Sequence, residues 1–137
     1  MRIEPYVIFD GRCEEAIEFY KKQLGAKVNM LSRFKDNPQP PEPGKMTPGT
    51  ENKVMHGSLQ IGDSTVLMSD GHCQNQPKFD GFALKLHAAN DAEAERLFEA
   101  LSSGGKVTMP MNKTFYASSF GMLTDRFGVM WMVIVQT

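Results

Sequence analysis

The chain has 137 residues, 41% of them hydrophobic, and is long enough to bury a core as a single domain without disulfide staples. Its formal net charge is −1 with acids and bases interspersed, so we expect neither nucleic acid nor a membrane surface as partner. No apolar run approaches the roughly 20 residues that span a bilayer. The opening residues lack a signal-peptide pattern and there are only two cysteines, which together favour a reduced, cytoplasmic protein.

The first part of the chain predicts a strand, a helix and a second strand. Residues 3–9 alternate in polarity and carry Pro5, which places this strand at a sheet edge. Apolar residues recur at intervals of three and four over residues 13–24, a spacing typical of a helix with one buried face. Gly25 follows where a helix commonly ends, and residues 26–34 predict a strand.

A proline-rich segment interrupts this regular pattern. Residues 35–52 contain five prolines and little to bury, which indicates an irregular loop, either a solvated excursion or a lid. Residues 54–61 and 65–69 then predict two strands joined by a hairpin turn at Gly62 and Asp63. The polar stretch 71–81 is the expected linker to the rest of the chain.

The second part of the chain repeats this order without the proline-rich loop. Alternation predicts a strand over residues 82–87, and Asn90 or Asp91 caps a helix that ends near residue 103. Three further strands are expected over residues 106–111, 115–123 and 129–135.

The two halves also match residue by residue. A shift of 79 positions places residues 14–30 on residues 93–109 and aligns six identities: Glu14 with Glu93, Phe19 with Phe98, Gly25 with Gly104, Lys27 with Lys106, Val28 with Val107, and Met30 with Met109. Such self-similarity indicates a duplicated supersecondary unit. We therefore predict an α+β fold in which two βαβββ modules, residues 1–70 and 82–137, form a curled, mostly antiparallel sheet around a cleft, with helices outside.

Several sequence segments carry a family resemblance. The words AIEFYKKQLGAKV and TDRFGVMWMVIV resemble the vicinal oxygen chelate superfamily, which includes glyoxalases, bleomycin-resistance proteins and extradiol dioxygenases. The runs PYVIFDGRCEEAIEFY, IGDSTVLMSD and TFYASSFGMLTDRFGVMWMV resemble its PhnB-like branch, often described as demethylubiquinone methyltransferase-like. The resemblance covers nearly the whole chain outside residues 35–52. It implies the two-module fold, but a fold of this kind hosts many activities.

The resemblance also implies positions for a metal. Metal enzymes of the superfamily place His, Glu or Gln on the first and last strands of each half, where a divalent ion acts as a Lewis acid. The corresponding positions here are Pro5 or Tyr6, Leu67 or Met68, Phe82, and Met132. Thioether and phenyl groups do not bind hard or borderline divalent ions. We therefore expect no metal at these positions and predict no cofactor.

The methyltransferase description has no support in the residues. Binding of a methyl donor such as S-adenosylmethionine usually needs a glycine-rich strand-to-helix loop in a parallel α/β sheet. The sequence predicts neither that loop nor that sheet.

A small organic molecule is the expected partner of the cleft. Pockets for such ligands are mostly apolar with a few convergent polar groups. The predicted ligand-binding residues combine four aromatic side chains with two methionines: Tyr6, Phe82, Tyr116, Trp131, Met68 and Met132. The alternative, which stays open, is that these residues form the core under the sheet.

A second hypothesis is an enzyme of the same superfamily, of lyase, isomerase or dioxygenase type. His56 would act as general base, with Tyr116 or Asp70 assisting. A hydrogen-bonded structural role for His56 is the alternative, and Asp125 before Gly128 is most simply a turn residue.

A minority hypothesis is zinc or iron held by His56, Asp70, His72 and Cys73. These are ligand types for zinc, but their spacing matches no established zinc pattern.

Finally, the resemblance implies a homodimer, which would cover sheet edges and apolar faces.

Overall fold

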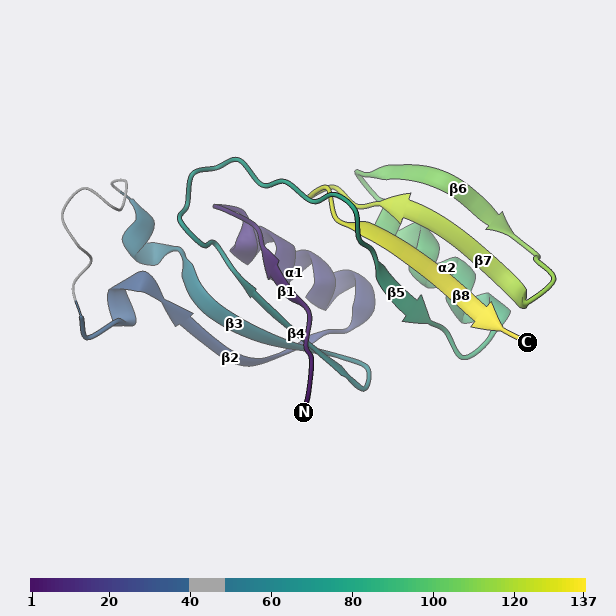
Figure 1. Cartoon of the computed structure of the whole chain (residues 1–137), viewed down its shortest axis with the longest axis horizontal. Coiled ribbons are helices and arrows are strands. Elements are labelled where there is room, and N and C mark those ends of the chain that lie inside the picture. Colours follow the sequence, from purple (N-terminus) through teal and green to yellow (C-terminus); the bar gives the residue numbers. More distant parts are fainter. Residues whose placement is uncertain (40–48) are drawn as a thin grey trace. The chain divides into compact units, whose positions relative to one another are not determined.

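Two βαβββ units make up the chain, as a computed structural model that describes residues 1–39 and 49–137 shows (Figure 1). The first unit comprises Met1–Pro77 and the second Lys78–Thr137. The boundary between them falls inside the linker predicted over residues 71–81. The expected α+β fold with two modules is confirmed.

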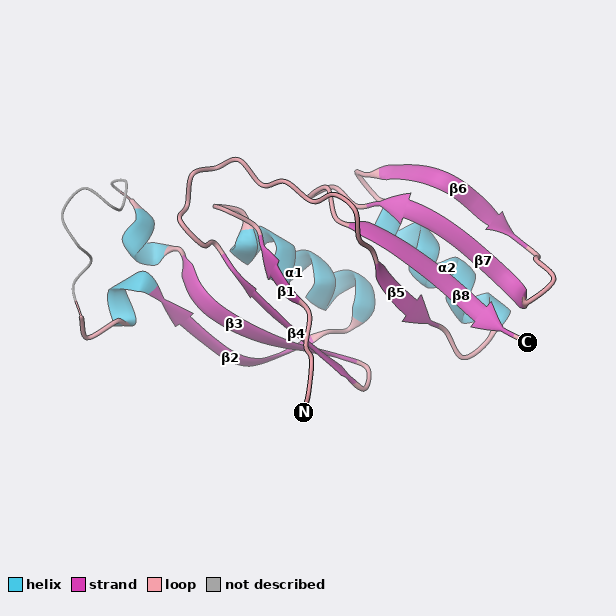
Figure 2. Ribbon diagram, in the orientation of Figure 1, coloured by secondary structure: helices cyan, strands magenta, loops and turns pink. Residues whose placement is uncertain are grey.

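The first unit has a four-stranded sheet with strand order β1-β4-β3-β2. Strand β1 runs parallel to β4, and the other two pairings are antiparallel. The elements in chain order are β1 (Tyr6–Ile8), α1 (Cys13–Leu24), β2 (Lys27–Arg33), two 3-10 helices (Phe34–Asp36 and Thr50–Asn52), β3 (Val54–Ile61) and β4 (Ser64–Ser69) (Figure 2).

The second unit repeats this arrangement with strand order β5-β8-β7-β6. Its one parallel pairing is again between the first and last strands, β5 and β8. The elements are β5 (Leu84–His87), α2 (Asp91–Ser102), β6 (Lys106–Asn112), β7 (Ala117–Thr124) and β8 (Met130–Gln136). No helix in the described parts of the chain has the length and apolarity needed to cross a membrane.

The duplication extends to irregular details of the sheets. The 79-residue shift maps β2 onto β6, which have corresponding bounds. Both strands also carry a register shift at the same place, between Val28 and Met30 in β2 and between Val107 and Met109 in β6. A bulge changes the face of the sheet to which the following side chains point. Because β2 and β6 share this feature, corresponding residues of the two strands lie on corresponding faces of their sheets.

Each helix covers one face of its own sheet, and in the second unit a central glycine permits the close approach. A Cβ on Gly57 of β3 would lie 3.7 Å from Cδ1 of Ile17 in α1, an ordinary contact distance. A Cβ on Gly121 of β7 would lie 2.6 Å from a ring carbon of Phe98 in α2, closer than real Cβ contacts allow. Side chains alternate across a strand, so residues beside these glycines point to the opposite, helix-free face of the sheet.

The helix ends follow the sequence signals. Gly25 has φ of 66°, and its N–H bonds the carbonyl of Lys21 at 3.1 Å, as expected for a glycine that ends a helix. The Asn90 side chain accepts a hydrogen bond from the Glu93 N–H at 2.8 Å, which caps α2.

Some boundaries differ from the sequence prediction. Strand β1 begins only at Tyr6, after Pro5, because proline has no N–H to give to a sheet. The segment predicted as a loop over residues 35–52 includes most of one 3-10 helix and all of a second. Its residues 40–48 lie outside the described part of the chain. Strand β5 begins at Leu84, two residues later than predicted.

A buried carboxylate joins the start of α1 to the first sheet. Asp70 is fully buried, and its Oδ1 accepts hydrogen bonds from the N–H groups of Gly11 at 2.7 Å and Cys13 at 2.8 Å. Its Oδ2 accepts from the Val54 N–H at 2.8 Å. A negative charge also complements the N-terminal end of a helix. Asp70 therefore holds α1, β3 and the end of β4 together.

Both cysteines lie beside this carboxylate. Cys13 is the first residue of α1, and the Cys73 N–H bonds the Asp70 carbonyl at 2.9 Å. Burial, followed by the charge of Asp70, raises the pKa of the Cys13 thiol far above its usual range. The same two causes raise the pKa of Cys73 to about 11. Neither thiol is poised as a nucleophile at neutral pH.

We predict that Asp70→Asn destabilises the protein. An amide can replace only one of the two accepting oxygens, so at least one buried N–H loses its acceptor, at a cost of about 2–4 kcal/mol. Urea unfolding of the variant measures this loss. Asp63→Asn, at an exposed turn, is the matched control and is expected to change stability by less than about 0.5 kcal/mol. Equal stability of the two variants would contradict the anchoring role.

We also predict that Cys73 reacts slowly with a thiol reagent. With a pKa near 11, its thiolate fraction at pH 8 is about 100-fold below that of an ordinary cysteine. Reaction with 5,5′-dithiobis(2-nitrobenzoic acid), followed in native buffer and in urea, tests this. Rapid labelling of one thiol in the native protein would contradict the burial and charge described for Cys73.

Candidate functional site

The helix-free face of each sheet carries the candidate site. In the first unit, strand pairing places Met30, Ser58, Leu67 and Tyr6 in one row across all four strands. In the second unit the corresponding row is Met109, Met122, Met132 and Lys85. We call these the first row and the second row.

The first row lies on an exposed, largely apolar surface. Tyr6 is 47% exposed and Met30 is 46% exposed, and Ile8 on the same face of β1 is 48% exposed. Large apolar side chains clustered on one sheet face are unusual for a surface that meets only water.

His56 adds a polar group to this surface. The Tyr6 hydroxyl lies 3.5 Å from Nδ1 of His56, at the long limit of a hydrogen bond, and the two ring centroids are 5.8 Å apart. Nδ1 accepts this hydrogen bond in one tautomer and donates it in the other. The pair thus gives an otherwise apolar face one site able to donate and accept hydrogen bonds.

Two residues of the second row pack against a buried apolar cluster. Met122 and Met132 are half-buried and pack against Ala117, Phe120 and Ile134. The Tyr116 ring, 39% exposed, lies 6.0 Å from the Phe120 ring in an edge-to-face arrangement. Predicted residues Tyr116 and Met132 therefore both border the helix-free face of the second sheet.

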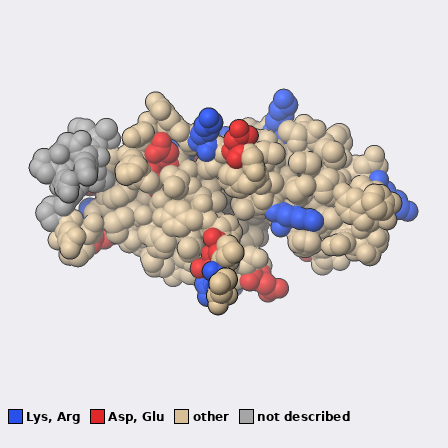
Figure 3. Space-filling view, viewed as in Figure 1, with Lys and Arg blue, Asp and Glu red and all other residues tan. Residues whose placement is uncertain are grey.

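In Figure 1, α2 lies behind strands β6, β7 and β8, so the helix-free face of this sheet is turned toward the viewer. The same view in Figure 3 shows charged side chains scattered among a majority of uncharged residues.

Two predicted ligand-binding residues lie on the helix side of their sheets. Met68 is only 1% exposed and is paired with Gly57, the residue against which α1 packs. Trp131 is only 4% exposed, and its indole Nε1 donates to Oδ2 of Asp125 at 2.9 Å. Both side chains belong to the core, and their neighbours Leu67 and Met132 occupy the helix-free face instead.

The remaining predicted residues are placed apart from both rows. Phe82, 45% exposed, precedes β5, and its ring lies 6.4 Å from that of Phe79. Both carboxylate oxygens of Asp70 accept backbone hydrogen bonds in the core, which leaves it no exposed oxygen with which to assist a base.

The residues of the minority metal hypothesis are not assembled into a site. Within residues 1–39 and 49–137, no three His, Cys, Asp or Glu side chains are grouped to hold a metal ion. His72 is exposed, whereas Asp70 and Cys73 are buried.

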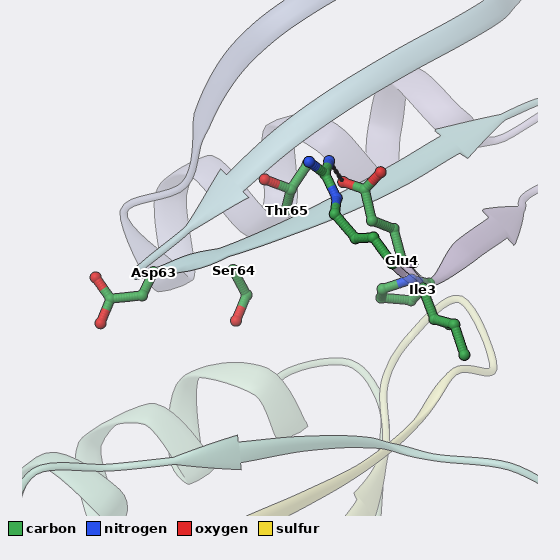
Figure 4. Close-up of a pocket in the computed structure, with 7 residues that line it drawn as sticks. Ile3, Glu4, Asp63, Ser64 and Thr65 are labelled. Carbon is green, nitrogen blue, oxygen red and sulfur yellow. Dashed lines mark ion pairs between the residues drawn. The ribbon is translucent and has the colours of Figure 1, made fainter.

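A separate hollow of about 420 Å³ lies between the N-terminal segment and the β3–β4 turn (Figure 4). The side chains of Arg2 and Glu4 form an ion pair of 2.7 Å there. The lining consists of Arg2, Ile3, Glu4, Pro5, Asp63, Ser64 and Thr65. The hollow is open and polar and includes none of the predicted site residues.

Asp125 has a structural role that the sequence indicated only in part. As predicted, it shapes a turn, since its Oδ1 accepts from the N–H groups of Phe127 at 2.9 Å and Val129 at 3.0 Å. The additional bond from Trp131 fixes the indole in the core.

Comparison with known proteins places this fold in a family. A family model described as 3-demethylubiquinone-9 3-methyltransferase matches residues 1–134. Protein YjdN of Escherichia coli is 33% identical over 98% of this chain and 95% of its own length.

Solved structures agree with this assignment. Protein PA1353 from Pseudomonas aeruginosa is 41% identical, with a TM-score of 0.85 over 99% of this chain and 98% of its own. A PhnB protein from Bacillus cereus, titled a putative 3-demethylubiquinone-9 3-methyltransferase, shares the fold at 23% identity (TM-score 0.79; 98% and 99% covered). A glyoxalase-related enzyme from Fulvimarina pelagi shares it at 13% identity (TM-score 0.62; 99% and 89% covered).

The family's description names a methyl transfer, whereas the site residues bear no resemblance to a methyl-donor site. Each sheet is mixed, with one parallel pairing, and differs from the parallel α/β sheet that usually binds S-adenosylmethionine. Sequence, fold and relatives nevertheless agree on descent: the chain belongs to the family whose model is described as 3-demethylubiquinone-9 3-methyltransferase.

Proposed function

We propose that this protein binds a small organic molecule on the helix-free face of its first sheet, with Tyr6 and His56 in contact with the ligand. The observation that carries the proposal is the combination of exposed apolar side chains with the Tyr6–His56 pair. Ligand sites are mostly apolar surfaces with few, well-placed polar groups.

The chemistry of the surface suggests the class of ligand. An aromatic or otherwise flat apolar body would cover Ile8, Leu67 and the Tyr6 ring. A hydroxyl or carbonyl group on that body would form a hydrogen bond with the Tyr6 hydroxyl or with a ring nitrogen of His56. Phenols, quinones and aromatic carboxylates combine both features.

The free energy of binding requires both the apolar contact and the hydrogen bonds. Covering roughly 200 Å² of apolar surface contributes about 5 kcal/mol before the cost of association. Micromolar binding requires about 8 kcal/mol. Apolar contact alone therefore falls short, and hydrogen bonds to Tyr6 and His56 would supply much of the difference.

Residue chemistry on the first and last strands of each unit argues against the hard divalent ion of the superfamily's enzymes. The positions on the first and last strands of each unit are Tyr6, Leu67, Lys85 and Met132. A phenol, a hydrocarbon, an ammonium and a thioether are poor ligands for such an ion.

A second candidate function is catalysis with His56 as general base. The Tyr6 hydroxyl at 3.5 Å favours this candidate, because it would orient the imidazole and leave Nε2 for a substrate proton. Tyr6 would then take the assisting role predicted for Asp70. Tyr116, from the second sheet, remains a predicted assistant.

We further propose that the protein is a homodimer, because strands β2 and β6 at sheet edges carry exposed apolar residues. Val28 and Met30 are 40% and 46% exposed, and Val107 and Met109 are 42% and 46% exposed. Light scattering is expected to give twice the chain mass of 15.3 kDa. A mass of one chain at micromolar concentration would contradict this proposal.

A cytoplasmic location likewise remains a prediction.

The binding proposal is tested with melting curves in a panel of phenols, quinones and aromatic carboxylates. A compound present at 100 times its Kd is expected to stabilise the native state by about 2.7 kcal/mol. Tyr6→Phe and His56→Ala should each weaken that compound at least tenfold.

His72→Ala is the matched control, because His72 is exposed and stands outside the helix-free face. Unchanged affinity in both Tyr6→Phe and His56→Ala would contradict the proposed site. If His56→Ala instead retains affinity and abolishes turnover of a bound compound, the enzymatic function is favoured.

A further inference from the structure

Three methionines stand side by side on adjacent strands of the second sheet. Met109 of β6 is paired with Met122 of β7, and Met122 is paired with Met132 of β8. Directly paired residues present their side chains on the same face, with Cβ atoms about 4.5–5.5 Å apart. The flexible side chains of Met109 and Met132 can therefore each extend toward the thioether of Met122, which lies between them on the helix-free face.

Buried apolar residues lie beside these thioethers on the same face of the sheet. Met122 and Met132 are half-buried against the cluster of Ala117, Phe120 and Ile134. Met109, at the sheet edge, is 46% exposed. The side chains of this cluster carry no oxygen or nitrogen, so the three thioether sulfurs are the soft donor atoms of the second row.

Packing alone does not explain three methionines. In the first unit, the matching row has Ser58 in place of Met122 and Leu67 in place of Met132. Leu67 is half-buried, as Met132 is, which shows that a hydrocarbon side chain serves at this position of the repeat. The second row thus differs from the first in its donor atoms.

We propose that Met109, Met122 and Met132 bind a soft monovalent cation, copper(I), through their three sulfur atoms. Thioethers are soft ligands that select copper(I), and methionine's flexible side chain allows three sulfurs to converge on one ion. Lys85, paired with Met132 and exposed, is the charged neighbour in the row. Its ammonium repels a monovalent ion less than a divalent one.

The organic-ligand site proposed above is built from residues of the first sheet and this one from residues of the second, so different substitutions test the two proposals. Silver(I) is a suitable probe because it has the same charge and ligand preference as copper(I) and needs no reductant. The thiols are removed by using a Cys13→Ala, Cys73→Ser background, since thiolates also bind silver. Titration is carried out in chloride-free buffer by calorimetry.

One silver ion per chain is expected in this background. Met122→Leu should weaken binding at least 30-fold, and Met109→Leu and Met132→Leu at least tenfold each. Leucine conserves side-chain volume and apolarity, so folding should be retained. Met30→Leu is the matched control, because Met30 is the repeat counterpart of Met109 and faces Ser58 rather than a methionine.

The proposal is overturned if saturable binding is absent, if Met122→Leu leaves the affinity unchanged, or if Met30→Leu weakens it equally. Should the cysteine-free background fail to fold, methionine methyl NMR of the unsubstituted protein gives the same decision. The methyl signals of Met109, Met122 and Met132 must then shift together at one equivalent of silver, and that of Met30 must not. Organic-ligand affinity in Met122→Leu should stay unchanged, so failure of either proposal is distinguishable.

Discussion

The packing of each helix on one face of its own sheet is the constraint on which the rest of the structure depends. It is closest at Gly121, where no side chain fits beneath Phe98, whereas Gly57 faces Ile17 of α1 at an ordinary contact distance. Because side chains alternate along a strand, this contact decides for every strand which residues face the helix. The buried Asp70 secures the arrangement in the first unit by joining the helix start to β3.

Sequence reasoning predicted the architecture well, because its signals were local and duplicated. The repeat, the helix periods and the turn glycines specified the two helices and the order of elements along each module. It was harder to predict which face of each strand packs against the helix. Strand β8 contains the run Met130–Val135, which is apolar throughout, and β4 is apolar at both Leu67 and Met68. When both faces of a strand are apolar, alternation carries no information about which side meets the helix. The sequence therefore leaves open whether Met68 and Trp131 line a ligand site or belong to the core, and the structure shows that both are buried in the core.

The polar residues show a second limit. Asp70 looked like a polar group at a strand end, but its partners Gly11 and Cys13 lie 59 and 57 residues away in the sequence. The Tyr6–His56 contact likewise joins residues 50 apart. No local pattern signals such pairs. The sequence did predict one strand pair, the hairpin over residues 54–61 and 65–69. The two rows also depend on the other strand pairings and their register, which the structure supplies.

We propose that ligands meet the helix-free faces and not the helix sides of the two sheets. A methionine methyl NMR titration with 8-anilinonaphthalene-1-sulfonate, an aromatic anion that binds apolar surfaces, tests this placement. Signals of exposed Met30 or Met109 and their row neighbours are expected to shift, with that of the buried Met68 unaffected. A shift of Met68 in the native protein, with Met30 and Met109 unmoved, would contradict it.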